Sequence, residues 1–238
     1  MRKMKGSGSY LRNQVRKNLA KVAFCLFLFS LIVFIAGLSF FLGLTLFIFE
    51  ASALLISLVP LALFYYYLRK YRIYNGGWEG EKQVTKLLSS KLNDDYFLLN
   101  DLHLRTGGGD IDHIVLGPNG VFVLETKNWS GEITCRGDEW QRAGKPNFKS
   151  SPSLQVKRNA SKIKQIIDSS PSLNLNGVWV EGIVVLTNSH STLRLNNPTV
   201  PILKLTQLAN HIISQRSSSG LSQRQLEEIG KEILRQKG

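Results

Sequence analysis

The chain has 238 residues, of which 43% are apolar and 20% are charged, and its 30 lysines and arginines outnumber 17 acidic residues to give a net charge of +13. The average hides one block, residues 22–68, in which Glu50 is the single charged side chain. This distribution excludes a wholly soluble protein and a polytopic transporter, and the presence of only two cysteines excludes a disulfide scaffold.

The apolar block predicts a membrane anchor. A bilayer core about 30 Å thick is crossed by about 20 apolar residues in a helix, whereas a straight helix of the whole block would reach roughly 70 Å. The block therefore predicts two crossings, with the reversal either near residues 37–43 or at residues 50–52. A cleaved signal peptide is disfavoured because its apolar region is shorter, about 7–15 residues.

Basic residues flank the block on both sides. Residues 1–21 carry seven lysines and arginines and no acidic residue, and Arg69, Lys70 and Arg72 follow the block. Positive flanks are typical of cytoplasmic ends, so we expect an integral cell-membrane hairpin whose N-terminus and C-terminal domain are both cytoplasmic. The predicted parts are a basic tail (1–21), a transmembrane region (22–68), a linker (69–77) with a hinge at 75–77, a globular domain (78–215), and a flexible joint with a C-terminal amphipathic helix (216–238).

The globular region is predicted to be a mixed α/β domain around a central sheet. Its most distinct feature is a hairpin, in which residues 111–116 and 120–126 are apolar runs on either side of a Gly-Pro-Asn-Gly turn. Hydrophobic spacing predicts the remaining elements. These are helices over 78–92, 154–167, 206–213 and 222–236, and strands over 96–100, 129–136, 178–186 and 199–203.

Three ionisable residues of this hairpin could support chemistry. Alternate side chains of a strand share a face, so Glu125 and Lys127 point the same way, and Asp112 approaches them if the two strands pair in a suitable register. Two carboxylates and a lysine suit a hard cation such as Mg²⁺, which acidifies a bound water beside an orienting ammonium group. The alternative is a plain salt bridge between Glu125 and Lys127 on a solvated face.

Further polar residues could complete such a site. Glu81, on the first predicted helix, could reach the same cation. Helical spacing places Gln155, Arg158, Asn159 and Lys162 on one face of a later helix, where they could line a substrate groove. The region from residue 69 to the end has seven more basic than acidic residues, which suits a nucleic-acid partner, DNA or RNA, and equally an anionic lipid surface.

A series of short motifs in this region resembles the NERD (nuclease-related) domain, which is grouped with the PD-(D/E)xK nucleases. The motifs are Gly80-Glu81, Ile111-Asp112-His113, Phe122-Val123-Leu124-Glu125-Thr126-Lys127, Gly131, Trp140 and Pro152-x-x-Gln155.

The resemblance implies a restriction-endonuclease-like core and Mg²⁺-dependent hydrolysis of phosphodiester bonds. It makes Asp112 and Glu125 the metal carboxylates, Lys127 the catalytic lysine, Glu81 an accessory acid and Gln155 a polar residue of the site. Two alternatives stay open: a non-catalytic module that binds nucleic acid or protein at the membrane, and a structural protein that only docks a partner.

Overall fold

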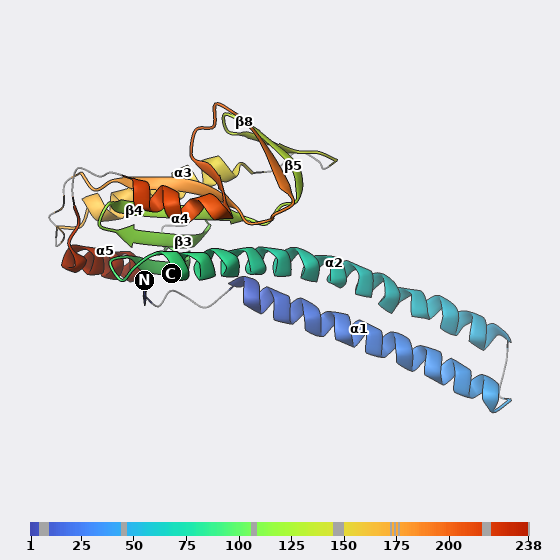
Figure 1. The fold of residues 1–238 in the computed structure, drawn as a ribbon. Helices are drawn as coiled ribbons and strands as arrows, with labels where there is room; N and C mark the ends of the chain where they lie inside the picture. The colour runs from blue at the N-terminus through green and yellow to red at the C-terminus, as the bar shows by residue number, and fades with distance from the viewer. Residues whose placement is uncertain are drawn as a thin grey trace. The chain divides into compact units, whose positions relative to one another are not determined.

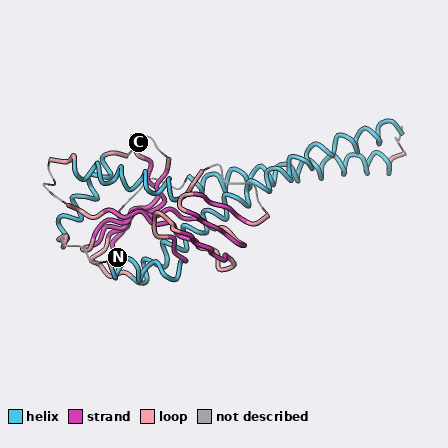
Figure 2. Tube along the Cα trace, turned by 90° about the horizontal axis from the view of Figure 1, so that it is seen from above, coloured by secondary structure: helices cyan, strands magenta, loops and turns pink. Residues whose placement is uncertain are grey.

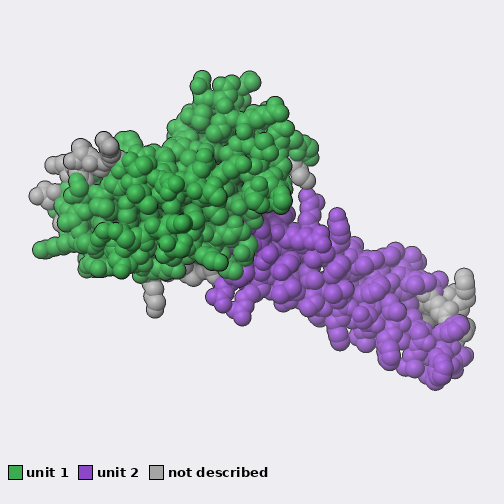
Figure 3. Space-filling model, in the orientation of Figure 1, with its two compact units in different colours: residues 1–8, 79–238 green, residues 9–78 purple. Residues whose placement is uncertain are grey.

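The computed structural model describes residues 1–4, 10–43, 47–105, 109–144, 150–171, 173, 175, 177–215 and 220–237. Residues 216–219 of the expected flexible joint (216–220) lie outside these ranges. The chain forms two compact units (Figures 1 and 3): Met1–Gly8 together with Glu79–Gly238, and Ser9–Trp78.

The unit Ser9–Trp78 is a pair of antiparallel helices (Figures 1 and 2). They are α1 (Tyr10–Phe41) and the first part of α2 (Phe47–Lys91). Both helices are long and apolar enough to cross a bilayer, and only 11% of the most apolar window of each is buried, unlike a core helix of a soluble protein. Since α1 ends at Phe41 and α2 runs unbroken through residues 50–52, the reversal lies just after the first of the two expected positions.

One expected irregular segment is in fact regular. The predicted linker and hinge do not interrupt α2, which continues as a helix through residues 69–77 to Lys91. Each glycine inside a helix costs only about 1 kcal/mol, which neighbouring good helix formers readily offset. Within the predicted basic tail (1–21), Arg2–Met4 forms strand β1 and α1 begins at Tyr10.

A mixed six-stranded sheet forms the centre of the larger unit, in the order β1-β2-β3-β4-β7-β9. The predicted hairpin is confirmed, with antiparallel pairing of β3 (Asp110–Gly117) and β4 (Gly120–Lys127). The strands β4, β7 (Val180–Leu186) and β9 (Ile202–Lys204) are parallel, so their carboxyl ends lie at one edge. The strand predicted at 96–100 extends further, as β2 (Phe97–His103).

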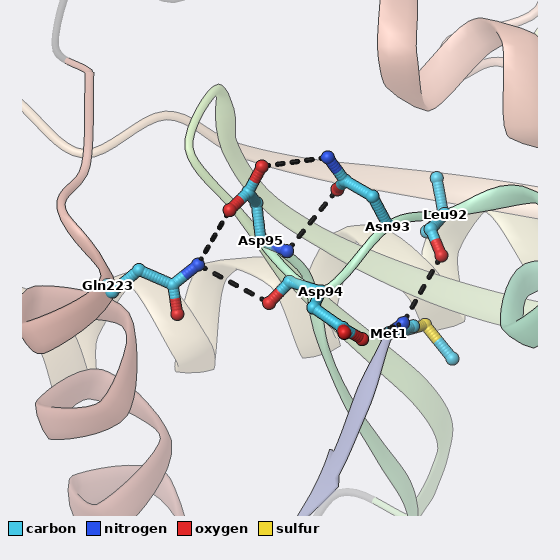
Figure 4. Close-up of polar contacts among 6 residues, drawn as sticks. All are labelled: Met1, Leu92, Asn93, Asp94, Asp95 and Gln223. Carbon is cyan, nitrogen blue, oxygen red and sulfur yellow. Dashed lines mark hydrogen bonds and ion pairs between the residues drawn. The ribbon is translucent and has the colours of Figure 1, made fainter.

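Strand β1 attaches the start of the chain to this sheet. Arg2, Lys3 and Met4 pair in parallel with Phe97–Leu99 of β2, and the Arg2 N–H donates to Tyr96 O at 2.9 Å. The Met1 amino group donates to Leu92 O at 3.2 Å (Figure 4). A three-residue strand is too short to show alternation, which is why its pairing was not predicted.

Helices cover both faces of the sheet. The end of α2 and α4 (Leu205–Ser214) bury apolar residues on one face. On the other face lie α3 (Pro152–Asp168) and α5 (Gln223–Arg235). Helix α3 approaches β7 closely because Gly182 has no side chain: a Cβ there would lie 3.1 Å from Val156 O. This mixed sheet between helices confirms the predicted α/β class.

A second, three-stranded sheet has the order β6-β5-β8. Strand β5 (Gly131–Arg136) falls within the strand predicted at 129–136, whereas β6 (Glu139–Arg142) and β8 (Ser191–Asn196) were not predicted. Most residues of β8 are exposed, so it lacks the apolar pattern that identifies a strand.

Candidate functional site

Strand pairing brings the predicted acidic residues to the end of the β3–β4 hairpin. His113 pairs with Leu124, so the next position of the same register sets Asp112 opposite Glu125. Val121 and Val123 pack in the core beneath α3 and α5, and the alternation of β4 directs Glu125 and Lys127 to that same face. The site therefore faces α3, at the carboxyl end of β4.

Two short hydrogen bonds organise these groups. Lys127 Nζ donates to Glu125 Oε1 at 2.5 Å, and the Thr126 N–H donates to Asp112 Oδ2 at 2.6 Å. The Glu125 side chain is 2% exposed and that of Lys127 is 24% exposed. The carboxylate of the pair is thus buried and its ammonium half-buried, unlike the solvated salt bridge of the alternative interpretation. The second carboxylate oxygen of Glu125, Oε2, is buried without a hydrogen-bond partner among the described residues.

The electrostatics of the site show a shortage of positive charge. Burial, followed by the charges of Glu125 and Glu81, raises the pKa of Asp112 well above its ordinary value. Burial also raises the pKa of Glu125, although Lys127 opposes the change. Burial by itself would lower the pKa of Lys127, but Glu125, Asp112 and Glu81 outweigh it and raise that pKa. A bound cation would favour the ionised form of both carboxylic acids.

Glu81 joins this electrostatic cluster from α2. Burial, then the charges of Asp101 and Glu125, raises the pKa of Glu81 to about 8. Asp101 was not predicted. It lies in β2 with a left-handed backbone (φ 54°), a conformation that non-glycine residues adopt rarely and often at functional sites. No local sequence pattern marks it, since it comes near the site only through the sheet.

The pKa of Glu81 predicts a pH-dependent stability. Because the native state keeps this proton up to about pH 8 while the unfolded chain loses it near pH 4.5, stability should fall as the pH rises through this window. We expect Glu81→Gln, which stays neutral, to raise the melting temperature relative to the parent at pH 8.5 and to change it least at pH 4.5. The measurement is thermal unfolding in EDTA at both pH values. An equal effect at both would contradict this titration.

The polar residues of helix α3 differ in their exposure and in their interaction with the site. Arg158 is exposed and its charge lowers the pKa of Glu125, so this predicted residue acts on the site. Asn159 is buried and its Nδ2 lies 3.4 Å from Asp110 O on β3. Gln155 and Lys162 are half-buried on the same helix.

The start of α3 is held by the second sheet. Ser151 is the N-cap and accepts from the Leu154 N–H at 3.3 Å, and Trp140 Nε1 donates to the buried Ser153 Oγ at 3.0 Å.

His113, beside Asp112 in sequence, is buried and hydrogen-bonded through Nδ1 to Asn100 Oδ1. Burial lowers the pKa of His113 to about 3, which fits a packed, neutral side chain.

The carboxylates do not form a complete cage. Among the described residues no group of three or more His, Cys, Asp or Glu side chains is arranged to hold a metal ion. The three carboxylic acids of the predicted set, Asp112, Glu125 and Glu81, therefore interact electrostatically but are not arranged to coordinate one metal ion. Mg²⁺ in enzymes is often bound by only one or two carboxylates, with waters and substrate phosphates completing its shell.

Comparisons with known proteins identify one family over part of the chain. Residues 76–187 match the family model described as nuclease-related domain, NERD. An uncharacterized protein of Bacillus anthracis is 45% identical over 60 residues, which are 24% of this chain and 28% of that protein. The chain thus matches less than a third of that relative's length. No solved structure matches the chain significantly.

Proposed function

Residues 76–187 carry a nuclease-related (NERD) domain, and on this premise we propose that the protein hydrolyses phosphodiester bonds of nucleic acid. The observation that supports the proposal most directly is the group of Asp112, Glu125 and Lys127, in which Glu125 is buried, the other two are half-buried, and one carboxylate oxygen of Glu125 is unpartnered among the described residues. Such a group is costly for a fold to maintain, and its residue types are those that phosphoryl chemistry needs.

The residues fit a divalent cation. Asp112 and Glu125 would hold it, since burial disfavours the ionised forms of both carboxylic acids and a cation would favour them, and Glu125 Oε2 has no other described partner. When bound, Mg²⁺ supplies positive charge to the phosphate and acidifies a coordinated water.

The protein's own groups have separable roles. The Thr126 N–H fixes the orientation of Asp112, and Glu125 holds the Lys127 ammonium within the site. Lys127 would orient the attacking water or stabilise charge on the phosphoryl oxygens. Arg158, exposed on α3 and acting on Glu125, would bind the substrate backbone, with Gln155 about one turn before it and Lys162 about one turn after it.

The test is cleavage of mixed DNA and RNA by the full chain in detergent, with Mg²⁺ or with EDTA. The full chain is needed because β1 pairs with β2, so a fragment starting near residue 75 would lack one strand of the sheet. We expect cleavage that requires the divalent ion. Absence of cleavage for every substrate, by folded protein in Mg²⁺ and Mn²⁺, would overturn the proposal.

The second candidate is a non-catalytic module that binds nucleic acid at the membrane. It is favoured by the lack of a preformed three-ligand group among the described residues and by the surplus of basic residues from residue 69 onward. Such a module would bind nucleic acid without cleaving it, and it would keep its affinity after Lys127→Met. A structural protein that only docks a partner would do neither.

We further propose that α1 and the first part of α2 anchor the protein in the cell membrane as a hairpin. The support is topological: β1 precedes the anchor, the other strands follow it, and both belong to one compact unit. The chain on both sides of the hairpin must then be on the same side of the bilayer, which requires an even number of crossings. Basic flanks place that side in the cytoplasm.

A further inference from the structure

The segment that follows Lys127 places an aromatic ring beside the candidate site. Residues 128–130 join β4 to β5, and Trp129 is half-buried in this segment and packs against the core that α3 covers. Lys127 Nζ lies 5.9 Å from the centre of the Trp129 ring. The negative face of an indole ring attracts an ammonium group within about 6 Å of its centre. Trp129 therefore interacts with the same ammonium group that donates to Glu125.

The second sheet holds the Trp129 ring in place. Trp129 and Trp140 of β6 meet edge to face, with their ring centres 6.0 Å apart and an angle of 76° between the ring planes. This arrangement is one of the two that aromatic pairs prefer. Trp140 is buried, and its Nε1 donates at 3.0 Å to Ser153 Oγ in the first turn of α3. The orientation of the Trp129 ring thus depends on both β6 and α3.

The backbone on either side of Trp129 is also held. The side chain of Arg142 on β6 donates from Nε to Ser130 O at 2.7 Å and from Nη2 to Ser130 Oγ at 3.0 Å. On the other side, the Thr187 N–H donates to Lys127 O at 3.1 Å. Hydrogen bonds to neighbouring strands therefore restrain both ends of the segment, and Trp129 cannot move away from Lys127 without breaking them.

We propose that Trp129 is a positioning residue for Lys127, whose ammonium group its ring keeps beside Glu125. The proposal rests on the proposed function for the reaction that this ammonium group serves. Lysine has a long, flexible side chain that gains entropy when it leaves an ordered position. Glu125 accepts one hydrogen bond from Lys127 Nζ, and the ring of Trp129 adds a second contact from another direction. Two contacts restrict the ammonium group more than one, which preorganises it for the reaction.

The first test measures this contact without catalysis. Thermal unfolding of the full chain in detergent and EDTA is recorded for Trp129→Leu in two backgrounds, the parent and the double variant Glu125→Gln with Lys127→Met. We expect Trp129→Leu to lower the melting temperature by about 2–4 °C more in the parent, since only the parent has an ammonium group beside the ring. The control is Trp179→Leu, an exposed indole beside Gly120 at the opposite end of β4, which should have equal effects in both backgrounds.

The second test separates the rate of cleavage from substrate binding. Trp129→Leu should lower kcat by about tenfold and change KM by less than about twofold, because a displaced ammonium group fails in the transition state while the substrate-binding residues are unchanged. Trp129→Phe keeps an aromatic face for the ammonium group, so its kcat should stay within about threefold of the parent value. A role of Trp129 in packing alone would not give this rescue together with a selective loss of kcat.

The outcomes distinguish the inference from the proposed function. Equal effects of Trp129→Leu on the melting temperature of both backgrounds, or an unchanged kcat, would overturn the inference and leave the proposed function standing. A change in KM alone would assign the ring to substrate binding and overturn its positioning role. A larger loss of melting temperature in the parent background, in a protein that cleaves no nucleic acid, would support the contact between Trp129 and Lys127 and overturn the proposed function.

Discussion

Lys127→Met should reduce divalent-dependent cleavage by about 100-fold or more. Methionine has most of the volume of lysine but no charge and no N–H group. It therefore cannot donate the hydrogen bond that Lys127 Nζ makes to Glu125 Oε1 at 2.5 Å. The substitution should also lower stability, since it leaves the almost fully buried Glu125 carboxylate unpaired, which typically costs about 3–5 kcal/mol. Initial cleavage rates and thermal unfolding measure the two effects.

A double variant separates catalysis from folding. Glu125→Gln combined with Lys127→Met replaces the buried ion pair by two neutral side chains of similar size, so we expect most of the lost stability to return. Cleavage should stay absent because both groups are needed for it. The single Lys127→Met variant should lose stability further as the pH rises above about 4.5, since its Glu125 must ionise without a partner. Parental cleavage by folded Lys127→Met would place the chemistry elsewhere.

Cysteine labelling should show that the two flanks of the anchor lie on one side of the membrane and its reversal on the other. We expect a membrane-impermeant maleimide applied outside intact cells to label Leu42→Cys, and to label Lys3→Cys and Gln141→Cys only after permeabilisation. All three positions are exposed, whereas the native cysteines Cys25 and Cys135 are buried and contribute little background. The physical reason is that β1 is hydrogen-bonded to β2, so both flanks share one folded unit.

Two other labelling patterns would contradict this topology. If Leu42→Cys also required permeabilisation, the helices would not cross the bilayer and the hairpin would be peripheral. If Lys3→Cys were labelled outside while Gln141→Cys was protected, an odd number of crossings would separate β1 from its sheet. The parent protein, labelled before and after permeabilisation, is the control for background.

Local sequence patterns determined those features of the protein that depend on a single segment of the chain. The length of the apolar block determined two helices, because a bilayer crossing needs a fixed number of residues. The alternation on both sides of Gly117–Gly120 determined the hairpin, and the twofold period of a strand put Glu125 and Lys127 on one face. These residues also determined that the site combines carboxylate groups with an ammonium group.

Only the tertiary structure decided how distant segments meet. The pairing of β1 with β2 joins residues more than ninety positions apart, and no local pattern encodes it. Three features of the site depend on backbone hydrogen bonds and burial in the assembled sheet. They are the register that sets Asp112 opposite Glu125, the hydrogen bond from Lys127 to Glu125, and the electrostatic interaction of Asp101 with Glu81. A cleft lined by Thr187 and Lys204 likewise lies where three parallel strands, distant from one another in sequence, end at one edge of the sheet.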